Sequence, residues 1–234
     1  FSYFTKGFQH PSGHPENHFP IVRTAADGDS ERMVAALQES FPFRVTLHHS
    51  EGTSRLAPFM SDFPLQSMGD LGTRMAIVDR PFGAVDEASV RVTVIEASGD
   101  TVLSREYGVE AVPLTDGQWD ERLREALAGV DLPNRPYGFR EVDAALPRPE
   151  HWPSTTRVIM GRDHSVWLAL ADLPGRAERE WAVLDEDGVP RFRVDLPRRF
   201  RLFTASGDVL WGVWRDELDV PHVQRYRLVD GNRR

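Results

Sequence analysis

The last third of the chain repeats one pattern: a strand, a short turn of Asp, Gly or Ser, and a second strand. Turns of this kind stand at residues 161–164, 184–188, 204–208 and 228–231. Asp163 and Gly207 are 44 residues apart, and Gly188 and Gly231 are 43 apart, so two alternating turns share one period. A unit of four antiparallel strands has about this length. The period therefore predicts an all-β fold of repeated four-stranded antiparallel sheets, as in the blades of a β-propeller.

The strand patterns predict how these sheets pack. Residues 166–170 form a nearly continuous apolar run, which indicates an inner strand buried on both faces, whereas residues 90–95 alternate as a half-buried strand does. We expect one partial propeller domain over residues 1–234, with about 3.5 to 4 blades of a ring. Its expected parts are an incomplete blade (1–40), a blade (41–115), a helix insertion plus blade (116–196) and a C-terminal blade (197–234). The remaining blades are expected from an upstream part of the same natural chain.

One segment interrupts the strands with a helix signal. Thr115 and Gln118 fit the S/T-x-x-E/Q capping box, and Trp119 and Leu123 begin an apolar stripe at helical spacing. The pattern predicts one inserted helix near 116–129. Residues 131–153 are rich in proline, and we expect a long connection there over the surface.

Composition excludes several classes of function. The chain has 36 Asp and Glu against 28 Lys and Arg, a formal net charge of −8, so nucleic acid is not an expected partner. Arg198 and Arg199 form a pair too short for a basic patch of its own. The chain has no cysteine, which excludes disulfides, thiolate metal sites and cysteine nucleophiles. No apolar run approaches the ~20 residues that span a bilayer.

Several segments resemble a known family. Residues 212–228, with the string Arg-Asp-Glu-Leu-Asp at 215–219, resemble the closing segment of bacterial six-bladed β-propeller proteins of the TolB-like and NHL-like group. Parts of 181–197 are similar to the preceding outer hairpin, and 107–115 to a mid-ring insertion. The resemblance covers roughly residues 59–231. It implies the C-terminal part of a six-bladed ring in an exported protein, periplasmic or extracellular, and it assigns no activity.

Three aspartates are candidate metal ligands. Asp79, Asp163 and Asp172 fall at the ends of predicted inner strands, which in a propeller surround the central channel. The resemblance extends to six-bladed hydrolases that bind calcium there through Glu, Asn and Asp. The alternative is structural: Asp163 forms a turn, and Asp79 and Asp172 cap strands before loops.

A second acidic group, Asp216, Glu217 and Asp219, is a candidate for binding a ligand. Neighbouring carboxylates can serve acid–base chemistry or hold a hard cation. Because these three lie between two strands beside Arg215, the favoured interpretation is a solvated loop that is salt-bridged to Arg215.

No catalytic motif accompanies these candidates. The sequence has no G-x-S-x-G elbow, no Gly-rich phosphate loop and no H-E-x-x-H motif. It favours a non-catalytic binding or scaffold module, without a cofactor, for a protein, peptide or glycan ligand. The alternatives are a calcium-dependent hydrolase or lactonase with its site in the central channel, and a structural part of an envelope protein. Three or more acidic, Asn or His side chains converging in the channel would favour the enzyme.

Overall fold

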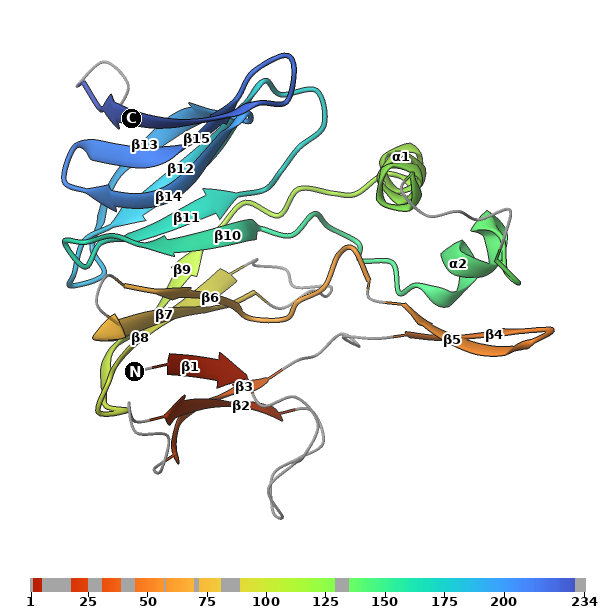
Figure 1. Cartoon of the computed structure of the whole chain (residues 1–234), viewed down its shortest axis with the longest axis horizontal. Coiled ribbons are helices and arrows are strands. Elements are labelled where there is room, and N and C mark those ends of the chain that lie inside the picture. The colour runs from red at the N-terminus through yellow and green to blue at the C-terminus, as the bar shows by residue number, and fades with distance from the viewer. Residues whose placement is uncertain are drawn as a thin grey trace.

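The computed structural model describes residues 2–5, 18–24, 31–38, 45–56, 58–69, 72–80, 89–128 and 135–229. Most of them are in strands, and every paired strand runs antiparallel to its neighbours, as the sequence predicts. Four larger sheets follow one another in chain order along one side of the molecule. Two helices and a hairpin lie on the other side (Figure 1).

The strands of each larger sheet pair in chain order. Sheet I contains β1 (Ser2–Thr5), β2 (His18–Thr24) and β3 (Glu31–Gln38). Sheet II contains β6 (Leu65–Met68), β7 (Arg74–Asp79), β8 (Ser89–Glu96) and β9 (Thr101–Gly108). Sheet III contains β10 (Thr155–Met160), β11 (Val166–Leu170), β12 (Glu178–Leu184) and β13 (Pro190–Pro197). Sheet IV contains β14 (Phe200–Ser206), β15 (Val209–Arg215) and β16 (Pro221–Arg227).

The sheets stack face to face because side chains alternate along each strand. In β11, Val166 and Leu168 pack into a core shared with sheet II, whereas Trp167 and Ala169 pack into a core shared with sheet IV. Strand β7 does the same one sheet earlier, with Ala76 and Val78 facing sheet III and Met75 and Ile77 facing sheet I. The continuous apolar runs of the sequence are therefore strands buried on both faces.

The repeated turns form as predicted at the three places that the structure describes. Gly188 and Gly207 have φ of 75° and 58°, a left-handed conformation that glycine adopts without steric strain. In the turn at 161–164, His164 takes the positive φ, at 63°. The fourth predicted turn, at 228–231, falls largely outside the described residues.

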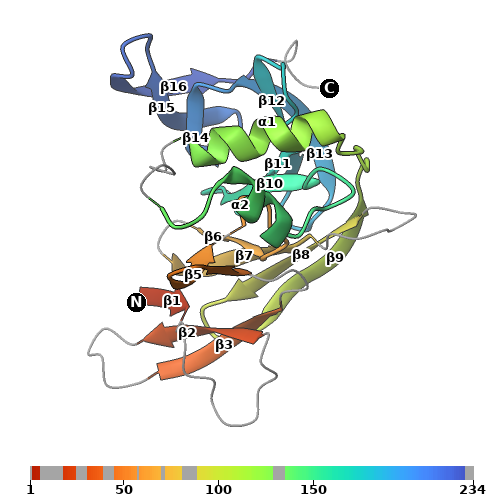
Figure 2. The same ribbon diagram turned by 90° about the vertical axis from the view of Figure 1, so that its right-hand side faces the viewer.

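The other side of the molecule has a core of its own. The hairpin of β4 (Val45–His49) and β5 (Gly52–Leu56) packs against α1 (Asp116–Leu127) and α2 (Phe139–Ala145), which Figure 2 shows in front of the sheets. Helix α1 begins at the predicted capping box, where the Gln118 amide donates to Thr115 Oγ1 and the Thr115 amide donates to Gln118 Oε1. The predicted stop at Gly129 lies outside the described residues.

Three expectations about this region need correction. The helix predicted near 116–129 is confirmed as α1, but it is not the single inserted helix, because α2 follows it. Residues 135–153 are also more than a surface connection, since Val142 of α2 and Trp152 are buried in the same core as α1. The four-stranded sheet expected within 41–115 begins only at Leu65, and residues 45–56 form the separate hairpin.

Candidate functional site

One end of sheets II, III and IV gathers arginine side chains. Strands β10, β12 and β14 begin at this end and β7, β11 and β15 finish there, so residues distant in sequence meet. We call this the arginine end. It faces α1 and is defined by eight side chains around two cavities: Arg80, Arg122, Arg157, Arg179, Arg198, Arg199, Arg201 and Arg215. Five carboxylates (Glu125, Asp172, Asp216, Glu217 and Asp219) also line the cavities, so among the described lining residues positive charge exceeds negative by three.

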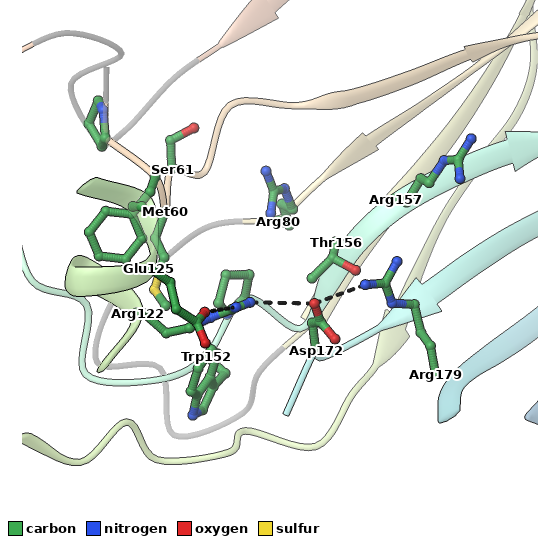
Figure 3. A pocket seen from close by; sticks show the side chains of 14 residues that line it. Met60, Ser61, Arg80, Arg122, Glu125, Trp152, Thr156, Arg157, Asp172 and Arg179 are labelled. Atoms are coloured by element: carbon green, nitrogen blue, oxygen red, sulfur yellow. Dashed lines mark hydrogen bonds and ion pairs between the residues drawn. The ribbon is translucent and has the colours of Figure 1, made fainter. Parts of the chain in front are cut away.

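The first cavity, of about 580 Å³, lies between sheets II and III and helix α1 (Figure 3). Its floor includes Trp152 and Pro153, and Arg122 lies over the Trp152 ring with its guanidinium carbon 5.5 Å from the ring centre. Arg80, directly after β7, donates from Nη1 to the carbonyl of Thr155 at 2.9 Å. This bond ties the end of sheet II to the start of sheet III.

The second cavity, of about 830 Å³, lies between sheets III and IV. Arg157 and Arg179 line both cavities, so the two adjoin along these side chains. Arg201 stacks over Phe203 with 5.3 Å between the guanidinium carbon and the ring centre. Volumes in this range suit small-molecule ligands.

Asp172 organises the boundary between the cavities. Its Oδ2 lies 2.9 Å from Arg179 Nη2 and 3.4 Å from Arg122 Nη2, and its Oδ1 lies 2.7 Å from Arg198 Nη2. Figure 3 shows the first two of these contacts. The Asp172 side chain is only 17% exposed, so water screens these pairs weakly. One carboxylate thus fixes three guanidinium groups and neutralises one of their three charges.

Arg157 differs from these arginines. Within the described part of the chain, no hydrogen bond or ion pair joins its side chain to another residue. Burial, followed by repulsion from Arg201 and Arg179, lowers the pKa of Arg157 below its usual value. Burial also lowers the pKa of Arg80 to about 10, with the charge of Asp62 acting in the opposite direction. Both side chains remain charged at neutral pH, although their surroundings disfavour the charge.

The structure separates the three candidate metal ligands. Asp79 ends β7 and Asp172 follows β11, both at the arginine end, whereas Asp163 lies in the turn at the far end of β10. Burial raises the pKa of Asp79, which Arg91 partly offsets. Asp172 is occupied by arginines. Over the described residues, no three His, Asp or Glu side chains group as metal ligands would.

Asp163 stabilises a turn, in agreement with the structural alternative predicted from the sequence. Its carboxylate accepts hydrogen bonds from Ser165 Oγ at 2.6 Å and from the Gly207 amide at 2.7 Å. Burial tends to raise the pKa of Asp163, but the bonds from Ser165 and Gly207 outweigh it, and the net pKa is lowered. Asp163 therefore joins sheet III to sheet IV.

The acidic loop after β15 forms the predicted contact. Asp219 Oδ2 lies 2.9 Å from Arg215 Nη1, which confirms the salt bridge of the sequence-based interpretation. Asp216 Oδ1 accepts from the amides of Leu218 and Val220, both at 2.9 Å, and its Oδ2 lies 2.9 Å from His222 Nε2. The His222 contact, first, and these amides lower the pKa of Asp216. The three loop carboxylates line the second cavity, and those of Asp216 and Asp219 also form hydrogen bonds or ion pairs that stabilise the loop itself.

Sequence reasoning missed the arginine end. Its members come from six separate segments between Arg80 and Arg215, so no stretch of sequence is strongly basic. The available signal was that nearly all cationic residues are Arg, with Lys6 the single lysine, together with the Arg198-Arg199 pair.

Comparisons with known proteins leave this site to be interpreted from its geometry. No protein-family model and no curated protein matches the chain. Among the described residues, neither helix combines the length and apolar character needed to cross a bilayer.

Proposed function

We propose that this chain is part of a β-propeller of the TolB-like or NHL-like six-bladed kind and serves as a non-catalytic binding module. Its support is the stacking of antiparallel sheets in chain order, with β6, β10 and β14 as the first strands of successive sheets II, III and IV. A propeller offers a rim of strand ends as a binding surface. On this reading the arginine end is the binding rim.

The observation that carries the proposal is the excess positive charge at the arginine end of a chain whose net charge is −8. Guanidinium groups are planar donors that match carboxylate and phosphate oxygens in pairs. Asp172 holds three of them in place, which limits the entropy lost when a ligand binds. The ligand expected from this chemistry is anionic.

The experiment is a calorimetric titration of the protein with probes that differ in charge. The panel contains tripolyphosphate, citrate, a hexa-aspartate peptide, a neutral oligosaccharide and a hexa-lysine peptide, each at about 50 and 300 mM salt. We expect saturable binding of at least one polyanion that weakens at higher salt, and none of the lysine peptide. Equal binding of neutral and anionic probes, or no binding of any anion, would contradict the proposal.

The calcium-dependent hydrolase stays a prediction of the sequence, without an observation that favours it here. Melting the protein with calcium and with a chelator tests it directly. A chelator-sensitive melting temperature, with calcium found in the purified protein, would support the hydrolase over the binding module.

A further inference from the structure

The arginine end contains two kinds of arginine. Arg122, Arg179 and Arg198 contact Asp172, and Arg215 pairs with Asp219. Their charges are balanced, in part or in full, by carboxylates of the protein. Arg157 has no such partner within the described residues, although it is half-buried and lies between the two cavities.

Arg157 is held where its charge is unfavourable. Arg201 and Arg179 both repel it, and burial removes part of its hydration. Figure 3 shows it on β10 with no dashed line to any residue, while Asp172 is joined to Arg122 and Arg179. A charge in such a position destabilises the free protein, and sites that do so are typical of functional residues. An anion placed against Arg157 would relieve both effects.

Building on the proposed function, we infer that Arg157 is the ligand-receiving residue of the arginine end and that the ligand is a small polyanion. One phosphoryl or carboxylate group binds between Arg157 and Arg179, at the junction of the cavities. A second anionic group reaches Arg201 and Arg199 in the second cavity. The arginines on Asp172 position this junction.

Two carboxylates of the second cavity already have partners in the protein, which is compatible with an anion binding at Arg157. Asp219 is paired with Arg215, and Asp216 accepts hydrogen bonds from its own loop and from His222. Both belong to the turn that follows β15, whereas Arg157 and Arg179 begin β10 and β12. The repulsion from these two carboxylates is therefore on the sheet IV side of the cavity. At the junction, the carboxylate of Asp172 is shared by Arg122, Arg179 and Arg198, so the described arginines there outnumber it.

The test compares Arg157→Gln with Arg191→Gln. Arg191 is an exposed arginine of β13 that lines neither cavity, so its variant makes the same charge change away from the site. The probes are tripolyphosphate, a phosphoryl polyanion, and citrate, a carboxylate polyanion, titrated by calorimetry. We expect Arg157→Gln to weaken binding about 10- to 100-fold, Arg157→Lys to weaken it less, and Arg191→Gln to leave it unchanged. Binding of one probe only identifies which anionic group the site takes.

The melting temperature of the free protein is the second readout. A ligand-receiving role predicts that Arg157→Gln melts at the same temperature as the wild type or higher, because an unfavourable charge is removed. A structural role predicts a loss as large as that of Arg179→Gln, which breaks the contact with Asp172. That loss, or binding as tight as in Arg191→Gln, would overturn the inference. If the wild type binds neither probe nor any other polyanion, the proposed function itself fails. If the wild type binds a polyanion and Arg157→Gln binds it as tightly, the inference about Arg157 fails and the proposed function stands.

Discussion

The carboxylate of Asp163 accepts a hydrogen bond from the Gly207 amide at 2.7 Å, across 44 residues of sequence. This separation equals the period that the turns show in the sequence. A backbone hydrogen bond also joins the same two turns, since the Arg162 amide donates to the Ala205 carbonyl at 2.8 Å. The sequence repeat therefore corresponds to a contact in the structure, because equivalent turns of sheets III and IV are hydrogen-bonded to each other.

Replacing Asp163 should loosen this junction. We expect Asp163→Ala to lower the free energy of unfolding by about 1–2 kcal/mol, because the Gly207 amide and Ser165 hydroxyl lose their acceptor. Urea unfolding measures the change. Asp187→Ala is the control, since Asp187 is exposed in the next turn and its side chain forms no hydrogen bond or ion pair with another described residue. Equal stability of the two variants would refute the role of Asp163 as a tie between sheets.

The same carboxylate predicts a dependence on pH. Because its pKa is lower in the folded state than 3.8, the ordinary value for an aspartate, ionised Asp163 stabilises the folded protein above about pH 4. This contribution is lost as the pH falls through the folded pKa. The stability difference between wild type and Asp163→Asn should therefore be constant from pH 5 to 7 and shrink near pH 3. A difference that grows toward low pH would show the opposite sign.

Two turn glycines form a matched pair. Both have positive φ, but a Cβ at Gly188 would lie 2.6 Å from Tyr107 Oη and 2.8 Å from Leu103 Cδ1, whereas one at Gly207 would meet nothing within 4 Å. Gly207→Ala should cost about 1–2 kcal/mol for the backbone conformation alone. Gly188→Ala should cost a further 1–3 kcal/mol, roughly, for overpacking. Thermal unfolding compares them, and equal costs would mean that the hairpin of β12 and β13 does not pack closely on β9.

Asp172 provides a stability test at the arginine end. Asp172→Asn removes the charge shared by three guanidinium groups, and we expect a loss of about 2–4 kcal/mol in the free energy of unfolding. Glu125→Gln is the comparison, because Glu125 is exposed and, among the described residues, pairs with Arg122 alone, so the expected loss is below about 1 kcal/mol. A loss for Asp172→Asn no larger than that for Glu125→Gln would mean that Asp172 does not organise the site.

The fold could be predicted from the sequence where the signal is local. Turn glycines, alternating strands and the Thr115–Gln118 capping box each depend on residues a few positions apart, and the structure confirms all three. Helix α2 was missed because its seven residues lie among prolines and its N-cap is Gly138, which offers no side-chain acceptor. The β4–β5 hairpin was not separated from sheet II because strand patterns do not state which core a strand faces.

The candidate site was harder to predict from the sequence than the fold. Arg157 on β10 and Arg201 on β14 stand 44 residues apart, the same separation as Asp163 and Gly207, so they occupy similar positions in successive sheets. The sequence shows this spacing, but the convergence with Arg80 and Arg122 depends on how sheets II and III and helix α1 pack. The aspartates singled out by strand position include one that binds arginines and one that holds a turn.

Hydrogen–deuterium exchange with and without a saturating polyanion tests the central claim most directly, because it shows where the ligand binds. Protection is expected at the arginine end, in residues 153–159, 172–181 and 197–203, with no change in the turns at 161–164 and 205–208. Protection confined to those turns, or spread evenly over the sheets, would contradict the claim that the arginine end is the binding site.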